Sequence, residues 1–261
     1  MNDSKQGTAL VTGASSGIGE AFARQLASQG HDLTIVARRK DRLEDLAEEL
    51  RSSYAISVDV IVADLSTEKG IERVEEHIRH VENLDVLVNA AGFGISGHFA
   101  DISPGKSIAM INVHVLAATR FCRAVLPNMI KRNRGSIINV SSMVAFSPLV
   151  GNTVYAATKS YLNMFSRSLQ TELGNFHIRV QALCPGFTYT GFHDTEEYRD
   201  FSRSSVPKAL WMSAQEVAER SLKALSKNKV VFVPGIKNRI LAGLMNNETI
   251  SRCIIKFKRQ R

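Results

Sequence analysis

The sequence contains few of the features that mark a secreted or membrane-spanning protein. Its three cysteines, Cys122, Cys184 and Cys253, are odd in number and far apart among 261 residues, which argues against a disulfide framework and favours a reducing compartment. The uninterrupted apolar runs are all much shorter than the roughly 20 residues of a membrane span. The polar residues 1–7 lack the apolar core of a signal peptide. We therefore expect a cytoplasmic protein.

The sequence also lacks a strongly charged body. Residues 237–261 hold seven Lys or Arg and one acid, Glu248, so they contribute +6 to the formal net charge of +8 and leave +2 for the rest. Proteins that bind nucleic acid across their fold usually carry a basic face on the domain itself. We therefore do not expect nucleic acid as a partner.

Short β-branched runs alternate along the chain with longer segments of helical periodicity, which is typical of a parallel sheet with crossover helices. Strands are predicted over residues 8–12, 32–37, 57–63, 84–89, 135–141, 177–184 and 229–233. Helices are predicted over residues 18–29, 40–52, 67–81, 105–131, 153–173 and 213–227, the last with Ser213 as its N-cap. No linker divides the units. The predicted fold is α/β: one doubly wound Rossmann-type domain over residues 1–236, with a seven-stranded, mainly parallel sheet and helices on both faces.

A glycine-rich loop of spacing G-x-x-x-G-x-G follows the first predicted strand and precedes a helix. Glycines allow a sharp turn and a close approach to a pyrophosphate, and a helix N-terminus offers free N–H groups. A tight strand–helix turn is the alternative, but the position after the first strand favours dinucleotide binding. The loop residues expected to contact the dinucleotide are Gly13, Ser15, Ser16, Gly17, Ile18 and Gly19.

The second predicted strand ends without an acidic residue, in Ala37-Arg38-Arg39. An acid at this position would accept a hydrogen bond from the ribose 2′-hydroxyl of NAD(H), whereas a guanidinium binds a 2′-phosphate in a bidentate manner. The two arginines therefore favour NADP(H) over NAD(H). The alternative is that both are ordinary solvated surface charges.

Tyr155 and Lys159 lie four residues apart in the helix predicted over 153–173, so their side chains share one face. A cation beside a phenol favours the phenolate and lowers its pKa from about 10, which suits general acid–base catalysis. Many helices contain such a pair by chance. Its interpretation therefore depends on the other residues of the chain.

Taken together, the motifs make the chain resemble the short-chain dehydrogenase/reductase family over nearly all of residues 7–235. They are, in order, the glycine loop 12–19, Asp64-Leu65, Asn89-Ala90-Ala91-Gly92, Asn112, Ser142, Tyr155-x-x-x-Lys159 and Pro185-Gly186. The family often has a second Asn where Ala90 stands, and Ala is a common variant. The resemblance implies an enzyme that interconverts carbonyls and alcohols with a nicotinamide cofactor. It also implies a homodimer or homotetramer, formed through the long helix and the Tyr155 helix.

The resemblance implies a role for each catalytic residue. Ser142 should hydrogen-bond the substrate carbonyl oxygen, and Tyr155 should exchange a proton with that oxygen. Lys159 should lower the pKa of Tyr155 and hold the nicotinamide ribose. Asn112 should anchor a water that links Lys159 to solvent, and could also form a helix kink.

The resemblance also implies the remaining cofactor contacts. These are Asp64 and Leu65 at the adenine, Asn89, Ala90 and Gly92 at the central portion, and Pro185, Gly186 and Thr188 at the nicotinamide. Asp64 could instead lie at the N-cap of the next helix, although Ser66 fits that position better. The histidines His98, His114 and His177 are interpreted as core or surface residues, and no metal is expected.

Aromatic residues are concentrated after the sixth predicted strand. Residues 187–211 hold six of the eighteen aromatic residues, which could form a lid over an apolar substrate. Met143, Val144, Phe146 and Val150 would line the other side. The alternative is that these rings only pack short helices against the body. We expect an apolar carbonyl compound or secondary alcohol, such as a lipid, steroid or acyl ketone, and a bulky aldehyde stays open.

The C-terminal segment 237–261 combines apolar residues at helical spacing, from Ile240 to Phe257, with flanking basic residues. This pattern predicts an amphipathic helix. Such a helix could lie on an anionic membrane, which would make the protein membrane-peripheral. The alternative is packing on the body or on a neighbouring subunit.

Two other functions have weaker support in the sequence. A non-catalytic dinucleotide-binding regulator would have no need of the complete set Asn112, Ser142, Tyr155 and Lys159. A sugar-nucleotide epimerase or dehydratase shares the Tyr and Lys chemistry, but usually has a longer substrate-binding part and the other glycine spacing. The sequence therefore favours a reductase.

Overall fold

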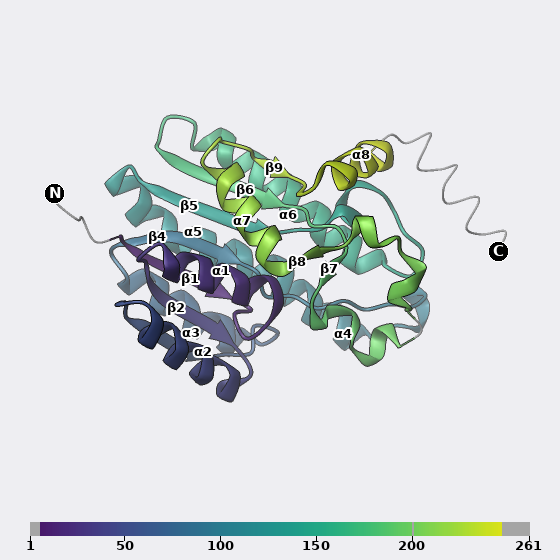
Figure 1. Ribbon diagram of the computed structural model, residues 1–261, viewed down its shortest axis with the longest axis horizontal. Helices are drawn as coiled ribbons and strands as arrows, with labels where there is room; N and C mark the ends of the chain where they lie inside the picture. Colours follow the sequence, from purple (N-terminus) through teal and green to yellow (C-terminus); the bar gives the residue numbers. More distant parts are fainter. Residues whose placement is uncertain (1–5, 200, 247–261) are drawn as a thin grey trace.

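The computed structural model describes residues 6–199 and 201–246. One seven-stranded sheet, in the order β3-β2-β1-β4-β5-β6-β9, runs through the molecule with helices on both sides (Figure 1). All neighbouring strands in it pair in parallel. The predicted doubly wound α/β fold is confirmed.

The elements follow the predicted order closely. The sheet strands are β1 Thr8–Thr12, β2 Asp32–Ala37, β3 Val58–Val62, β4 Leu84–Asn89, β5 Gly135–Val140, β6 Ile178–Leu183 and β9 Val231–Phe232. The main helices are α1 Gly17–Ser28, α2 Lys40–Ser53, α3 Glu68–His80, α4 Pro104–Ile111, α5 Ala117–Arg132, α6 Thr153–Glu172, α7 Ala214–Leu225 and α8 Ile236–Met245. A small ribbon of β7 Thr188–Tyr189 and β8 Met212–Ser213 lies outside the main sheet.

Two apolar cores form because successive strand residues face opposite sides of the sheet. Val11 of β1 packs in the core that includes α1, α2 and α7. Its neighbour Leu10 packs in the core that includes α3, α5 and α6. Strands covered on both faces need apolar side chains throughout, and this explains the nearly continuous apolar runs of β1, β2 and β4.

The sheet order reverses between β1 and β4, because β2 and β3 lie on one side of β1 and the later strands on the other. In open parallel sheets this reversal leaves a crevice at the carboxyl ends of the strands, where ligands bind. The glycine loop follows β1, the Asn89–Gly92 segment follows β4, Ser142 follows β5 and Pro185-Gly186 follows β6. The fold therefore gathers the sequence motifs at one edge of the sheet.

The long helix predicted over 105–131 is continuous from Pro104 to Arg132, but it is not a regular α-helix. A π-helical turn, Asn112–Leu116, separates α4 from α5. Such turns add a residue to the helix and often mark functional sites. The irregularity considered at Asn112 is therefore a π turn that begins at this residue.

The same helix, Pro104–Arg132, is long and apolar enough to pass a length-and-composition test for a membrane span, with 39% of its most apolar window buried. Its side chains Phe121, Cys122 and Val125 are fully buried in the core against the sheet. A core helix of an α/β domain satisfies the same test. Its packing shows it to be a core helix.

The segment 187–211, considered as a lid or as packed short helices, contains no α-helix among its described residues. Between β7 and β8 it contains four 3₁₀ turns, Gly191–His193, Glu196–Tyr198, Arg203–Ser205 and Lys208–Leu210. In Figure 1 this segment lies at the end of the sheet near α4 and α8. Of the predicted C-terminal helix, α8 is described, and residues 247–261 lie outside the described part of the chain.

Candidate active site

The catalytic set predicted from the sequence converges at the carboxyl ends of β5 and β6. Tyr155 and Lys159 lie on the first turns of α6 and are both buried. The Lys159 Nζ atom lies 5.5 Å from the centre of the Tyr155 ring and donates a 2.9 Å hydrogen bond to Val140 O. The Ser142 side chain is hydrogen-bonded to Tyr155. Three of the four predicted catalytic residues therefore meet at one point.

The protonation of this pair differs from the prediction. Burial raises the pKa of Tyr155 well above its ordinary value, the nearby Tyr198 raises it further, and the hydrogen bond from Ser142 offsets only part of this. Burial also lowers the pKa of Lys159 to about 7. The expectation that Lys159 lowers the pKa of Tyr155 is wrong for the protein alone. The reason is that desolvation of the phenol dominates, while Lys159 is itself only partly charged near neutral pH.

Asn112 begins the π turn, and its side-chain amide donates a 2.8 Å hydrogen bond to Ser66 O in the loop after β3. This bond ties the long helix to that loop. The water that Asn112 should anchor stays a prediction.

The sequence motifs do not predict the place of His114 in this site. The side chain is fully buried, and its ring centre lies 5.7 Å from that of Tyr155 in an edge-to-face arrangement. A Cβ atom added to Gly92 would lie 2.8 Å from His114 Nε2 and 3.7 Å from Lys159 Nζ. Its position two residues after Asn112, in a helix that leads to the site, was the available signal. The interpretation of His114 as a core residue is confirmed by its burial, but the motifs do not predict its contact with Tyr155.

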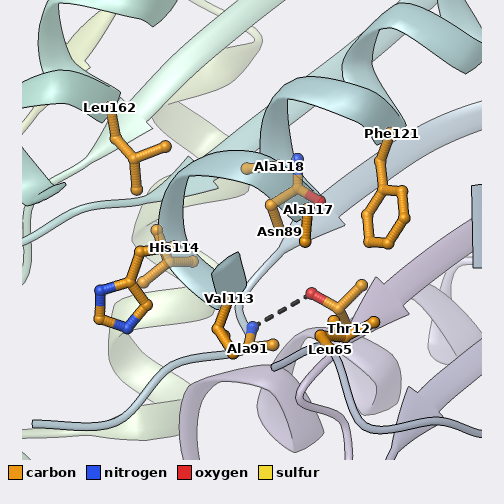
Figure 2. Close-up of a pocket in the computed structure, with 11 residues that line it drawn as sticks. Thr12, Leu65, Asn89, Ala91, Val113, His114, Ala117, Ala118, Phe121 and Leu162 are labelled. Atoms are coloured by element: carbon orange, nitrogen blue, oxygen red, sulfur yellow. Dashed lines mark hydrogen bonds between the residues drawn. The ribbon is translucent and has the colours of Figure 1, made fainter. Parts of the chain in front are cut away.

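The glycine loop packs directly against the segment after β4. Gly13 has φ +70°, and a Cβ atom there would lie 2.8 Å from the Ala91 backbone. The Thr12 hydroxyl accepts hydrogen bonds from the N–H groups of Ala90 at 3.0 Å and Ala91 at 3.1 Å. Figure 2 shows the Thr12–Ala91 bond below the helix turn that carries Val113 and His114. Gly19 is required because a Cβ atom would overlap Gly13 O, which keeps α1 close to the loop.

The two arginines after β2 point to different neighbours, Arg39 to this loop and Arg38 to Asp64. Arg39 donates hydrogen bonds to Ser15 O at 3.0 Å, to the Ser15 hydroxyl at 3.0 Å and to the Ser16 hydroxyl at 2.7 Å. Arg38 is exposed and lies close enough to Asp64 to lower the pKa of that carboxyl. A strand end that carries two cations beside a glycine loop fits a dinucleotide with a 2′-phosphate.

Asp64 is held by the loop that follows it. Burial opposes its ionisation, but hydrogen bonds from the Ser66 N–H and hydroxyl, together with Arg38, leave its pKa below the usual value. Neither Asp64 nor Ser66 caps α3. The N-cap is Thr67, whose hydroxyl accepts from Gly70 N.

The other predicted cofactor residues fall into two groups. The Asn89 side chain points into the protein, where it donates a 2.8 Å hydrogen bond to Asn139 Oδ1. Leu65 is buried in the core, and Ile18 packs against the other core. Among the residues expected to contact the nicotinamide, Pro185 O accepts from Met143 N at 3.0 Å and the Thr188 hydroxyl donates to Gly186 O at 3.1 Å. Ala90 N donates to the Thr12 hydroxyl beside the glycine loop, and Gly92 lies against His114 and Lys159.

The aromatic residues of 187–211 form a cluster that reaches the catalytic tyrosine. The Phe192 ring centre lies 5.8 Å from that of Tyr155. His193 stacks on Phe201 at 4.7 Å, and Tyr189 on Trp211 at 4.8 Å. A Cβ atom on Gly94 would lie 2.7 Å from Phe192 and would overlap the Tyr198 hydroxyl.

The residues predicted to line the side of the substrate site opposite the aromatic cluster do not lie together. Val144 packs in one cluster with Tyr155 and Phe192. Met143 and Phe146 pack instead with β6, β9 and α8, and Val150 is 60% exposed. Within residues 6–199 and 201–246, no group of three His, Cys, Asp or Glu is placed to hold a metal ion.

Comparison with known proteins gives consistent matches. A sequence model of the short chain dehydrogenase family matches residues 7–199. The NADP-dependent 3-hydroxy acid dehydrogenase of Schizosaccharomyces pombe is 34% identical over 235 residues, which cover 87% of this chain and 89% of that protein.

Two solved structures extend these matches. The short-chain dehydrogenase from Sphingobium yanoikuyae in complex with NADPH aligns with a TM-score of 0.81 at 33% identity, covering 88% of each chain. The bulky-bulky ketone specific alcohol dehydrogenase from Comamonas testosteroni aligns with a TM-score of 0.79 at 34% identity, covering 89% of this chain and 88% of that one. The family, the reaction class and the NADP(H) cofactor predicted from the motifs are thereby confirmed.

Proposed function

Because the chain belongs to the short-chain dehydrogenase/reductase family, we propose that it interconverts a bulky, apolar ketone and the matching secondary alcohol with NADP(H). A lipid, steroid or acyl ketone is the substrate class. The observation that carries this choice is the aromatic cluster of 187–211, which brings Phe192 to within 5.8 Å of the Tyr155 ring, centre to centre. Apolar, ring-lined walls bind apolar substrates, with a few polar groups to orient them.

One of the similar proteins supports this substrate class, because it is a bulky-bulky ketone specific alcohol dehydrogenase. The 3-hydroxy acid dehydrogenase supports the reaction class but not an apolar substrate, since a 3-hydroxy acid carries a carboxylate. The carbonyl of such a substrate must lie between an apolar wall and the Ser142–Tyr155 pair. Val144 and Phe192, both only partly buried, provide apolar surface in the cluster around Tyr155.

The chain's own residues account for the proton and charge steps. Ser142 and Tyr155 are positioned to donate hydrogen bonds to the substrate oxygen, which stabilises the charge that grows there during reduction. When bound, the cofactor supplies or removes the hydride. Tyr155 donates its phenolic proton to the oxygen, and Lys159, with a pKa of about 7, can replace that proton at neutral pH. In alcohol oxidation the same groups carry the proton in the reverse direction.

A panel of ketones of increasing size tests the substrate class, with NADPH oxidation followed by the loss of its absorbance. We expect kcat/KM to rise with apolar size. Phe192→Ala should change the order of preference among bulky ketones, while Tyr54→Phe, at an exposed position after α2, should not. A preference for small polar sugars would reject the substrate class and leave the reaction class untouched.

We also propose that the protein is cytoplasmic and can bind peripherally to a membrane surface. Helix α8 exposes an apolar stripe at spacing four, with Ile236 at 66%, Ile240 at 62% and Leu244 at 43% exposure. The sequence from residue 237 onward is strongly basic, which complements an anionic lipid surface. Packing of this stripe on a neighbouring subunit is the alternative.

Co-sedimentation with vesicles separates these two proposals. Vesicles with about a third of phosphatidylserine should retain the protein, and pure phosphatidylcholine vesicles should not, because the attraction is electrostatic as well as apolar. Ile236→Ser, Ile240→Ser and Leu244→Ser combined should abolish retention without lowering Tm, since all three side chains are exposed. Equal retention of the variant, or none of the native protein, would contradict the membrane proposal.

A further inference from the structure

His114 is a fully buried histidine that no predicted role uses. It lies in the π turn Asn112–Leu116 and contacts two other segments of the site. Phe93 N donates a 3.2 Å hydrogen bond to His114 Nε2 from the segment after β4. On the other side, His114 Nδ1 lies 3.0 Å from the Thr158 hydroxyl on α6.

These bonds determine the tautomer of the imidazole from both ends. Because the Phe93 N–H donates to Nε2, that nitrogen must carry a lone pair. The Thr158 hydroxyl donates its single hydrogen to Tyr155 O at 2.8 Å, so it must accept from His114 Nδ1–H. The result is one directed chain of hydrogen bonds, from Phe93 through His114 and Thr158 to the backbone of Tyr155.

The surroundings of His114 favour the neutral ring. Burial lowers its pKa well below the ordinary value of 6.5, and the charge of Lys159 lowers it further. The titratable groups that face it are Tyr155 and Lys159 of α6, and the segment after β4 presents only Gly92 and the ring of Phe93. A protonated Nε2 would also face the Phe93 N–H, donor against donor.

We propose that His114 is a positioning residue, whose neutral imidazole holds the Tyr155 ring and the Gly92–Phe93 segment in their reactive arrangement. The inference rests on the proposed function, because it assigns the segment after β4 to the cofactor and Tyr155 to proton exchange. The hydrogen bond between His114 and Phe93, here called the Phe93 arm, supports cofactor binding. The hydrogen bond between His114 and Thr158, called the Thr158 arm, orients the helix turn that carries Tyr155.

Two substitutions separate the arms. In His114→Gln the side-chain oxygen can replace Nε2 as the acceptor for Phe93, but the donor to Thr158 is lost. In His114→Asn the amide can replace Nδ1 as the donor to Thr158, but it is too short to reach Phe93. Since a net hydrogen bond is worth roughly a tenfold change, we expect His114→Gln to lower kcat about tenfold with the KM for NADPH within about twofold. His114→Asn should raise the KM for NADPH about tenfold and lower kcat less than His114→Gln does.

His114→Phe and His80→Gln complete the set. His114→Phe keeps an aromatic ring and removes both arms, so it should show both defects. His80 is exposed on α3, and its Gln variant should behave like the native enzyme. If all His114 variants that fold keep native kcat, native KM for NADPH and a native pH profile, the residue only fills space and the proposal is wrong.

A spectroscopic measurement tests the tautomer without any turnover. In ¹⁵N-histidine-labelled protein, His114 should give the signals of the neutral Nδ1–H form, and these should persist as the pH falls below 6.5 because burial opposes protonation. Signals of the Nε2–H form, or titration near 6.5, would overturn the proposal. Since this readout needs no substrate, it fails or succeeds independently of the substrate class.

Discussion

At the scale of single residues, burial decides the chemistry of the site more than sequence spacing does. The spacing of Tyr155 and Lys159 predicts a shared helix face, and the structure confirms it. The same spacing predicts a lowered phenol pKa, which the structure contradicts because desolvation acts on both groups. Burial depends on the segments that cover a residue, here including Phe192 and Tyr198, which lie far along the chain. Spacing within one helix carries no information about them.

The lowered pKa of Lys159 predicts a pH dependence of stability. Its folded-state pKa is about 7, below the ordinary 10.5, so between these values the unfolded chain binds more protons than the folded one. Stability gained from this group is therefore fully present above pH 10.5 and is lost as the pH falls toward 7, by up to about 1.4 kcal/mol per pH unit. Comparing Tm of the native protein and Lys159→Met from pH 7 to 10 measures this. The Tm of the native protein should rise relative to the Tm of Lys159→Met as the pH increases. Parallel curves of Tm against pH would contradict the lowered pKa of Lys159.

Arg38 allows a second prediction at this scale. Arg38→Asp places a carboxylate where a 2′-phosphate would lie, so like charges should repel. We expect kcat/KM with NADPH to fall about 100-fold and the cofactor preference to move toward NADH. A fall of this size corresponds to the loss of a charged hydrogen bond together with the repulsion between like charges. Arg42→Asp, also exposed but one turn into α2, is the matched control. An unchanged NADPH to NADH ratio in Arg38→Asp would show that this arginine is only surface charge.

At the scale of elements, the close contact between the glycine loop and α1 is a requirement of backbone geometry. A Cβ atom at Gly19 would overlap Gly13 O, whereas Gly243 of α8 has no neighbour within 4 Å. Gly19→Ala should therefore lower Tm and weaken NADPH binding, because the loop must move away from α1. Gly243→Ala should leave Tm unchanged or raise it slightly, since Ala in a helix is favoured over Gly by about 1 kcal/mol. Thermal unfolding with and without NADPH checks both, and equal Tm values for the two variants would contradict the packing described.

Element boundaries were predicted well where local signals determine them. β2 and β4 begin and end at the predicted residues, and Ser213 caps α7 with a 3.1 Å bond from Glu216 N. The π turn and the place of His114 were not predicted, because they depend on how the long helix meets α6 and the segment after β4. The structure of residues 187–211 was also missed. Aromatic content predicts burial, but it does not distinguish 3₁₀ turns from helices.

At the scale of the whole molecule, an unpaired apolar surface remains on the two helices expected to form an oligomer. Ile108 and Ile111 of α4 are 58% and 43% exposed, and Met164 of α6 is 59% exposed. Exposed apolar side chains on adjacent helices are typical of an interface between subunits. We propose that two copies of the chain associate through α4, α5 and α6.

Charged substitutions on this surface test the oligomer. Ile108→Asp with Met164→Asp should convert a dimer or tetramer into smaller species in light scattering coupled to size exclusion, because two desolvated carboxylates per subunit oppose association. Tyr54→Asp, exposed and outside these helices, should keep the native mass. A native protein that is already monomeric at micromolar concentrations would contradict the proposal.

The central claim is that Tyr155 exchanges a proton with a substrate held beside NADP(H). Its most direct test is Tyr155→Phe, measured for both NADPH binding and single-turnover ketone reduction. Removal of a general acid typically lowers the rate about 10²–10⁴-fold, and the Phe ring preserves the packing against His114 and Phe192. The account predicts that loss of rate with nearly native NADPH affinity. Reduction at the native rate by Tyr155→Phe would contradict it.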